Sequence, residues 1–321
     1  MTLRLSEADV RAVLTMSIAL DAVEDISRRQ ASGEAIVHPR RRIELPNHGF
    51  FHYMAAADMA AGFLGMKLYT FVKGELRFLV PLYRVETGEL VALIEADYMG
   101  QMRTGAASGV ATKYMARKDA RTAAIIGTGL QARSQLEAIA AVRKLESARV
   151  FGRDQQRREK FSSDMSAKLS LPITPAESAE KAATGADIIV TATTASHPVL
   201  RGDFISTGAH INAIGANHAH KSELDEGAVR RAHRIVVDSI EQSKVEAGDL
   251  IIAFAGEGAR WADISELSDV VTGKINPRTS ESDITLFKSN GIAAWDVAVA
   301  ERVFTLASQK GLGTELPLWK S

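Results

Sequence analysis

The stretch "RTAAIIGTGLQARSQLEAIAAV", residues 121–142, joins a short apolar run to two glycines and then to a helix-forming segment. The apolar run, residues 123–126, predicts a buried strand, and Leu136, Ile139 and Ala140 recur at helical spacing. Glycines between a strand and a helix let the backbone turn sharply and come close to another group. That group is either another piece of backbone or a phosphate.

The glycine turn fits the G-x-G-x-x-A pattern of dinucleotide-binding proteins. Its residues are Gly127, Thr128, Gly129, Leu130, Gln131 and Ala132. The first glycine makes the turn, the second lets a pyrophosphate approach, and the alanine permits close packing of helix on strand. The helix N-terminus then offers unpaired N–H groups and the positive end of its dipole. We therefore predict a pyrophosphate site, with a turn that serves packing alone as the alternative.

Length and composition restrict the class of protein. A chain of 321 residues favours two domains, and 46% hydrophobic with 24% charged residues is ordinary for a globular protein. Lysine plus arginine balances aspartate plus glutamate at 39 each, so we expect neither nucleic acid nor membrane as a partner. The absence of cysteine excludes disulfides and thiolate metal sites and fits a cytoplasmic protein. We expect no signal peptide and no membrane span.

The pattern of the chain changes near residue 121. Before it, Ser6 and Asp9 predict a helix start with a capping box, the helix running to about Arg29, and residues 41–97 alternate like strands. These signals predict a mostly antiparallel sheet with a helix packed on it. Later segments alternate between strand and helix, which predicts a parallel sheet covered on both faces. A last helix is expected after Gly291.

We therefore predict an α/β protein with a Rossmann-type doubly wound parallel sheet and an additional α+β domain for dimerisation and substrate binding. The expected substrate and dimerisation domain covers residues 1–118, together with the C-terminal helix at about 298–321. The expected dinucleotide-binding domain covers residues 119–297.

The end of the next predicted strand bears on the type of nucleotide. An acid about 20 residues past the glycine turn would bind the adenosine ribose and indicate NAD(H). Here Gly152 and Arg153 occupy that place, and Arg153 is suited to pair with a 2′-phosphate, with Arg157 or Arg158 in support. We favour NADP(H). NAD(H) remains possible because Asp154 lies only one or two positions late.

Three basic residues before the turn are candidates for a substrate site: Arg42, Lys67 and Arg103. Lys67 lies among apolar and aromatic residues in a predicted strand, where alternation could also point it to solvent. Arg103 lies early in an alanine-rich helix, where the helix dipole disfavours a cation unless an anion is bound. Two guanidiniums and an ammonium at one site would suit a carboxylate.

Several motifs together resemble the ornithine cyclodeaminase/mu-crystallin family over nearly the whole chain. They include "GMKLYTF", "MRTGAASGVATKYMAR", "IIGTGLQARSQLEAI", "GADIIVTATT", "GAHINAIGAN" and "TLFKSNGIAAWDVA". The resemblance implies a first domain that binds substrate and to which the last helix returns. It also implies a Rossmann domain, and a homodimer built around the sheet of the first domain.

The resemblance also implies roles for individual residues. Arg42, Lys67 and Arg103 match positions that hold the substrate carboxylate beside the nicotinamide. The pyrophosphate turn matches Gly127, Gly129, Gln131 and Ala132, flanked by Thr128 and Leu130. Further positions expected to bind the cofactor are Thr104, Thr191, Thr193, Ile214, Lys288, Ser289 and Gly291.

One position departs from the family pattern. Cyclodeaminases carry an aspartate after the "INAIG" strand that engages the substrate amino group, and this chain has Asn217 there. Asparagine carries no charge and cannot act as a base. We therefore expect a site that reduces a preformed imine rather than one that deaminates ornithine.

His218 and His220 are near enough to each other in the sequence to suggest a metal site. Because no carboxylate lies at ligand spacing, we predict no metal; contact of one of these histidines with the substrate stays open. His48 and His52 are expected at the surface or in loops.

The predicted function is NAD(P)H-dependent reduction of the C=N bond of an α-imino acid, such as pyrroline- or piperideine-carboxylate, to an amino acid. Arg42 and Arg103 would bind the carboxylate, and Lys67 would donate a proton or contact the carboxylate. The alternatives are an ornithine cyclodeaminase, an alanine-type amino-acid dehydrogenase, and a crystallin-like protein that binds a cofactor or ligand without catalysis.

Overall fold

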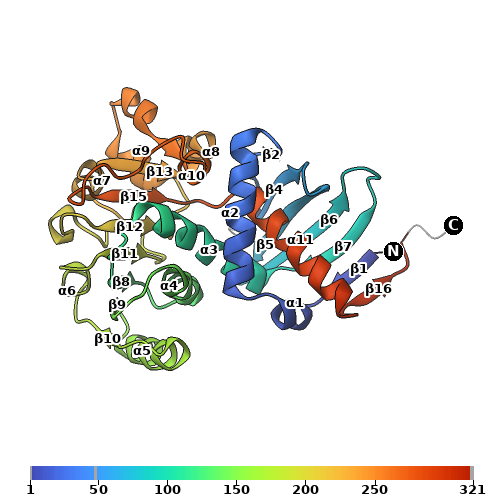
Figure 1. Ribbon diagram of the computed structural model, residues 1–321, viewed down its shortest axis with the longest axis horizontal. Coiled ribbons are helices and arrows are strands. Elements are labelled where there is room, and N and C mark those ends of the chain that lie inside the picture. The colour runs from blue at the N-terminus through green and yellow to red at the C-terminus, as the bar shows by residue number, and fades with distance from the viewer. Residues whose placement is uncertain (1, 47–48, 319–321) are drawn as a thin grey trace. The chain divides into compact units, whose positions relative to one another are not determined.

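The computed structural model describes residues 2–46 and 49–318, and the chain divides into two compact units. Unit 1 comprises residues 1–107 and 291–321, and unit 2 comprises residues 108–290. Unit 1 is therefore built from both ends of the chain, whereas unit 2 is continuous. The colours in Figure 1 follow this division, because the blue and red ends of the chain meet in one unit.

Unit 1 is organised around a mixed sheet in the strand order β16-β1-β7-β6-β5-β4-β2, with β3 pairing with β4. All its strand pairs are antiparallel except β1 with β7. The strands are β1 Thr2–Leu5, β2 Ala35–Val37, β3 Arg41–Leu45, β4 Gly49–Asp58, β5 Phe63–Val72, β6 Glu75–Arg84, β7 Leu90–Glu95 and β16 Thr314–Leu316. The predicted antiparallel sheet is thus confirmed, but strands β1, β2 and β16 were not predicted from the sequence.

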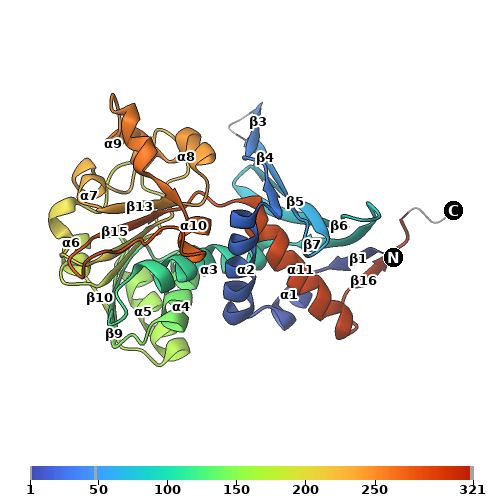
Figure 2. The ribbon, with the colours of Figure 1, turned by 45° about the horizontal axis from the view of Figure 1, so that its top comes forward.

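Helices cover one face of this sheet. They are α1 Glu7–Val13, α2 Met16–Ser32 and α11 Ala293–Gln309, and Figures 1 and 2 show α2 and α11 lying across the strands. Ser6 caps α1 with the predicted capping box to Asp9. The single helix expected up to about Arg29 is wrong, because the chain breaks after Val13 and Thr15 caps a second helix.

Alternation along β5 separates the two faces of the sheet. Phe63, Gly65 and Lys67 are buried, whereas Leu64 and Met66 are only half-buried. Gly65 allows a close fit, because a Cβ there would lie 3.4 Å from Val297 of α11. Lys67 therefore points to the face that α11 covers, and not to solvent as alternation alone allowed.

Unit 2 contains a parallel sheet in the order β10-β9-β8-β11-β12-β15-β13-β14. The chain starts in the middle at β8, moves outward to β9 and β10, and then returns to the other side of β8 with β11 and β12. This reversal of direction next to β8 is the switch point of a Rossmann-type doubly wound sheet, as predicted. The strands are β8 Thr122–Ile126, β9 Ser147–Phe151, β10 Ile173–Pro175, β11 Ile188–Thr191, β12 His210–Ala213, β13 Arg234–Val237, β14 Ser265–Glu266 and β15 Thr285–Lys288.

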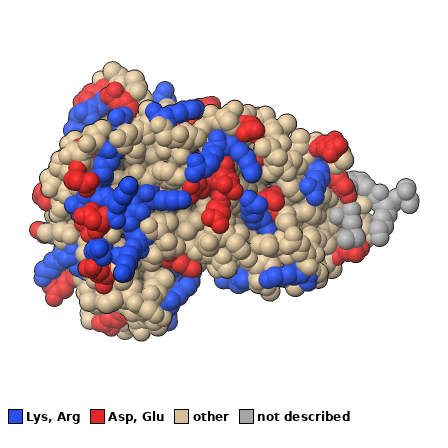
Figure 3. Space-filling model, in the orientation of Figure 1, with Lys and Arg blue, Asp and Glu red and all other residues tan. Residues whose placement is uncertain are grey.

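Two hydrophobic cores bury the two faces of this sheet. Leu136, Ile139 and Phe161 from helices α4 and α5 pack on one face, and Ala228 and Leu250 from α7 and α9 pack on the other. The helices are α4 Leu130–Val142, α5 Gln155–Leu169, α6 Ala179–Ala183, α7 Glu226–Arg230, α8 Ile240–Glu246, α9 Gly248–Ala253 and α10 Leu267–Val271, with short 3-10 turns at Gly202–Phe204 and Gly258–Asp263. On the face that Figure 3 shows, acidic and basic side chains lie side by side.

The unit boundaries differ from those predicted at residues 118 and 297. Helix α3, Asp97–Met115, runs through the first boundary, so the change of pattern at residue 121 marks only the next strand. Arg143 ends this helix by donating to the carbonyls of Thr112, Lys113 and Ala116. At the second boundary, Gly291 and all of α11 belong to unit 1.

Candidate functional site

A buried cluster of charged side chains lies in unit 1 where β5, α3 and α11 approach one another. Lys67 Nζ lies 3.1 Å from Asp296 Oδ1, and Arg103 Nε lies 3.0 Å from the same oxygen. The side chains of Lys67, Arg103 and Asp296 are 4%, 8% and 0% exposed. Asp296 Oδ2 has no hydrogen-bond partner among the described residues. Both cations thus contact one oxygen of the Asp296 carboxylate, and the other oxygen can still accept a hydrogen bond.

Arg40 completes the cluster from the segment before β3. Its guanidinium donates to the carbonyl oxygen of Gly291 over 3.3 Å, and its charge depresses the pKa of Lys67. Gly291 has φ +83°, and a Cβ at this position would lie 2.6 Å from Arg103 Nη1. Glycine is therefore required here both for backbone conformation and for space. Gly291, which was predicted to bind the cofactor, lies against Arg40 and Arg103.

Arg42 is not placed with Lys67 and Arg103. Its Nε lies 2.8 Å from Glu44, its side chain is 33% exposed, and its guanidinium lies 4.7 Å from the centre of the Phe50 ring. The structure therefore brings together two of the three predicted basic residues, and Arg40 is the third cation near them. The "PRRR" run offers three adjacent arginines, and the sequence did not reveal which one reaches the cluster.

Burial lowers the pKa of Lys67 to about 8, and the positive charge of Arg103 acts in the same direction, while Asp296 opposes both. The ammonium also lies 5.0 Å from the centre of the Phe78 ring and close to Gly100. An amine with a pKa near 8 can hold a proton at neutral pH and release it readily. The geometry therefore offers a proton donor beside two guanidiniums.

Aromatic side chains line the same face of the sheet next to Lys67. Tyr69 stacks on Phe78 at 5.0 Å, His52 hydrogen-bonds to the Tyr69 hydroxyl, and Phe50 lies 4.5 Å from His52. His52 is 5% exposed within β4, so the expected surface or loop position is wrong for this residue. His48 lies outside the described residues. The rings form an apolar wall with few polar atoms, beginning at the cationic cluster.

The glycine turn of unit 2 has the shape that the fingerprint predicted. Gly127 has φ +128°, and a Cβ there would lie 2.3 Å from the Ala192 carbonyl oxygen. A Cβ on Gly129 would meet nothing within 4 Å, so the backbone is open on that side. Gly129 caps α4 without a side-chain hydrogen bond, and Gln131 Oε1 is buried without a hydrogen-bond partner among the described residues. Helix N-terminal N–H groups and an open glycine fit a pyrophosphate.

The end of β9 lies against this turn, since a Cβ on Gly152 would come within 2.8 Å of Thr128 Cγ2. Arg153 follows and is exposed. Asp154 caps α5 by accepting from Arg157 N over 3.0 Å, so one of its oxygens is already engaged. Arg158 donates to the Gly152 carbonyl oxygen over 2.6 Å. An exposed arginine thus follows the end of β9, next to the glycine turn.

The other predicted cofactor positions are engaged within the protein. Lys288 is fully buried, with Nζ 2.9 Å from Asp249, and Ser289 donates to Asp238 over 3.0 Å. Thr191 and Thr193 donate to Glu223. In unit 1, Thr104 donates to the carbonyl of Gly100 over 2.7 Å. The Lys288 side chain thus points into the core, and the cofactor role of these positions stays a prediction.

The remaining predicted positions are less buried. Leu130 is 71% exposed at the start of α4. Ile214 and Asn217 are half-buried in the loop after β12. The rings of His218 and His220 lie 5.6 Å apart in the same loop. Among the described residues, no group of three or more histidine, aspartate or glutamate side chains is arranged to hold a metal ion.

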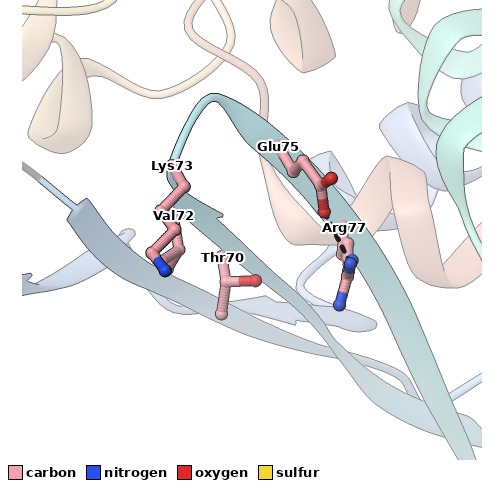
Figure 4. A pocket seen from close by; sticks show the side chains of 5 residues that line it. All are labelled: Thr70, Val72, Lys73, Glu75 and Arg77. Atoms are coloured by element: carbon pink, nitrogen blue, oxygen red, sulfur yellow. Dashed lines mark hydrogen bonds and ion pairs between the residues drawn. The ribbon is translucent and has the colours of Figure 1, made fainter.

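A shallow hollow at the tip of the β5–β6 hairpin is not part of these sites. Figure 4 shows that Thr70, Val72, Lys73, Glu75 and Arg77 line it, with an ion pair of 2.6 Å between Glu75 and Arg77. Thr70 and Val72 alternate with Lys67 along β5 and lie on the opposite face of the sheet.

Comparison with known proteins agrees with this geometry. The sequence pattern of the ornithine cyclodeaminase/mu-crystallin family matches residues 2–311. The chain belongs to the ornithine cyclodeaminase/mu-crystallin family. A Delta(1)-pyrroline-2-carboxylate reductase of Bacillus cereus is 37% identical over 261 residues, which cover 79% of this chain and 80% of that protein. The family resemblance inferred from the motifs is therefore confirmed.

Solved structures of family members share the fold over almost the whole chain. The Thermococcus litoralis Delta(1)-pyrroline-2-carboxylate reductase, in complex with NADH and L-proline, is 37% identical with a TM-score of 0.94, covering 98% of this chain and 100% of that one. An archaeal alanine dehydrogenase dimer with bound NAD is 33% identical with a TM-score of 0.93, covering 99% of both chains. None of the helices within the described ranges is long and apolar enough to cross a membrane.

Sequence reasoning missed two members of the cationic cluster. Asp296 is an isolated acid in the otherwise apolar start of α11, and an unexplained charge in a buried helix was an available signal. Arg40 gave no comparable signal, because it is adjacent to Arg41 and Arg42.

Proposed function

We propose that this protein is an NAD(P)H-dependent oxidoreductase that reduces the C=N bond of an α-imino acid to give an amino acid. The observation that carries the proposal is the buried contact of Lys67 and Arg103 with one oxygen of Asp296, where two cations meet a single carboxylate. A buried excess of positive charge is costly unless an anion joins it. The carboxylate of an imino acid supplies that anion.

The two guanidiniums are suited to bind the substrate carboxylate. Guanidinium groups present paired donors that match a carboxylate, and Arg103 is already oriented through its Nε by Asp296. Arg40 takes the role expected for Arg42, because Arg42 is paired with Glu44 at the surface. A carboxylate fixed by two arginines fixes the adjacent imine carbon as well.

Lys67 is the proposed proton donor to the imine nitrogen. A protonated imine accepts hydride more readily than a neutral one, and an ammonium with a pKa of about 8 is largely protonated at neutral pH. Asp296 orients the ammonium, and its second oxygen remains available to accept from the iminium N–H. The neighbouring aromatic wall of Phe78 and Tyr69 suits the carbon skeleton of a cyclic ketimine.

A reduced nicotinamide nucleotide, when bound, supplies the hydride. Gly127, Gly129 and the N-terminus of α4 would hold its pyrophosphate. We propose NADP(H) as the preferred nucleotide, because Arg153 is exposed next to the turn and Asp154 is engaged as a helix cap. An acid free to bind both ribose hydroxyls would have favoured NAD(H).

We further propose a homodimer formed through the uncovered face of the unit 1 sheet. The side chains that alternate away from the helices are largely apolar and remain partly accessible: Ile43, Phe51, Tyr53, Met66, Leu68 and Leu79. Ile43 is 50% and Leu79 is 37% exposed. A largely apolar face of this kind favours a partner, and a second copy is the choice consistent with the dimer of the archaeal relative.

An assay of nucleotide oxidation tests the proposed reaction. Purified protein is mixed with NADPH or NADH and with pyrroline-2-carboxylate, piperideine-2-carboxylate, or pyruvate plus ammonia, and the loss of reduced-nicotinamide absorbance is followed. We expect oxidation with a cyclic ketimine and no requirement for ammonia. Activity with pyruvate and ammonia alone would assign an alanine-type dehydrogenase. Conversion of ornithine to proline with release of ammonia would assign a cyclodeaminase and contradict the role given to Asn217.

A further inference from the structure

Glu223 is a buried carboxylate whose two oxygens are both saturated by hydrogen bonds. Oε1 accepts from the backbone N and the hydroxyl of Thr193, each over 2.7 Å. Oε2 accepts from the backbone N of Gly215 over 2.7 Å and from the Thr191 hydroxyl over 2.9 Å. Its side chain is 0% exposed, and nothing in the proposed reaction uses it.

These bonds join the ends of two neighbouring strands. Thr191 ends β11 and Thr193 lies in the loop that follows, whereas Gly215 follows β12. Gly215 must be glycine here, because a Cβ would lie 2.4 Å from both Glu223 Oε1 and the Thr193 carbonyl oxygen. The carboxylate therefore sets the spacing of two loops at the carboxyl edge of the sheet.

Glu223 is itself held firmly in place. Its backbone N donates to Asp249 Oδ1 over 2.6 Å, and its carbonyl oxygen accepts from Val199 and Leu200. Asp249 in turn pairs with Lys288, the last residue of β15. This arrangement connects the ends of three adjacent strands, β11, β12 and β15, through buried side chains.

The hydrogen-bond pattern requires a carboxylate rather than an amide. Each oxygen faces one backbone N–H, and a carboxylate accepts at both positions. A glutamine would place its NH₂ group against one of these N–H donors in either orientation. One buried N–H would then lose its acceptor, and the loop carrying it would move.

We propose that Glu223 is a positioning residue for the nicotinamide half of the cofactor, acting through the loops after β11 and β12. This inference rests on the proposed binding of a dinucleotide by unit 2. In a doubly wound sheet the two halves of the nucleotide lie on either side of the switch point, with the pyrophosphate at the first turn. Here the β9 side carries Arg153 for the adenosine half, which leaves the β11 and β12 loops for the nicotinamide half.

The test compares a whole cofactor with a fragment that lacks nicotinamide. Dissociation constants of NADPH and of 2′-phospho-ADP-ribose are measured by calorimetry for the wild type and for Glu223→Gln. We expect the variant to bind NADPH about tenfold more weakly, as for loss of one buried hydrogen bond, and to bind the fragment unchanged. If the wild type prefers NADH, the matched pair is NADH and ADP-ribose.

Asp225→Ala provides a structural control. Asp225 lies two residues away and caps α7, accepting from Ala228 N over 2.7 Å and from Gly202 N over 2.9 Å. We expect a lower melting temperature for this variant with both dissociation constants unchanged. If Glu223→Gln does not fold, Thr191→Val removes one bond to Glu223, and we expect a smaller loss of NADPH affinity with the same pattern.

Equal weakening of NADPH and the fragment, or no change in either, would show that Glu223 serves only the fold and would overturn the inference. Failure of the proposed function has a different signature. A wild type that binds both nucleotides normally but reduces no imine contradicts the reaction and leaves the role of Glu223 open to confirmation by the same titrations.

Discussion

The two units of this protein each bury a small group of charges, and they satisfy it differently. In unit 1, Lys67 and Arg103 share one oxygen of Asp296, and the other oxygen has no partner among the described residues. In unit 2, both oxygens of Glu223 are saturated, and Asp249 is paired with Lys288. Asp296 therefore has one oxygen that can still accept a hydrogen bond from a ligand, whereas both oxygens of Glu223 already accept from backbone N–H groups.

This difference separates the residues that we propose to contact a substrate from those that we propose to position loops. Buried charges that lack enough opposite charge and hydrogen bonds destabilise the fold. Proteins tolerate them where a bound ligand supplies the missing partner. A carboxylate whose two oxygens already accept hydrogen bonds from the backbone is better suited to fixing loops. The two groups should therefore respond differently to substitution.

The largest effect is expected from Lys67→Met. Loss of the proposed proton donor should lower kcat for imine reduction by about 10²-fold or more. The affinity for NADPH, measured by titration, should not change, because the glycine turn belongs to unit 2. Full turnover in this variant would exclude an essential role for Lys67.

The next effect distinguishes Arg40 from Arg42. Arg40→Gln should raise KM for the imino acid by about tenfold or more, because a charge-assisted contact to the carboxylate is lost. Arg42→Gln removes an exposed pair with Glu44 and should change KM little. Steady-state kinetics on both variants decide between them, and the opposite ranking would restore Arg42 to the site.

Arg153→Ala tests the nucleotide preference. Removal of the guanidinium should raise KM for NADPH by about tenfold and leave KM for NADH nearly unchanged, because only the 2′-phosphate loses a partner. Kinetics with each nucleotide at saturating imine give the ratio. An equal change for the two nucleotides would place the 2′-phosphate elsewhere or assign the enzyme to NAD(H).

Asp296→Asn should change the pH dependence of the reaction. Lys67 donates only when protonated, so kcat/KM should fall as pH rises through the pKa of about 8. Asp296 favours the protonated form, and its loss should move this alkaline limb to lower pH. A pH–rate profile measures the shift, and an unmoved limb would assign the titration to another group.

The smallest effect on catalysis is expected from Leu68→Lys on the uncovered sheet face. A charge at the centre of the proposed interface should convert a dimer into a monomer without altering the buried cluster on the other face. Analytical ultracentrifugation measures the mass. Thr70→Lys, toward the hairpin tip on the same face, is a milder comparison, and an unchanged mass in both variants would contradict this interface.

Much of this structure follows from local sequence patterns. The glycine turn, the capping box at Ser6 and the strand pattern around Lys67 are local signals, and each was confirmed because short-range geometry determines it. Strand β15 was missed, although it lies between β12 and β13. Its place depends on pairing with residues far away in the sequence.

The site was predicted in part for the same reason. Lys67 and Arg103 were identified from their unusual surroundings, whereas Arg40 could not be separated from its two neighbours without the start of β3. Asp296 acts more than 190 residues away from Arg103, as their hydrogen bond spans 193 positions. No local pattern can reveal such a pair.

The discontinuous construction of unit 1 has a consequence for synthesis on the ribosome. Unit 2 is complete once residue 290 has been made, whereas unit 1 must wait for α11. Until then Lys67 and Arg103 lack Asp296, and the sheet lacks one of its covering helices. The nascent chain therefore carries an incompletely covered apolar sheet until α11 has been made, and a product stalled or truncated before α11 would be a natural substrate for chaperones.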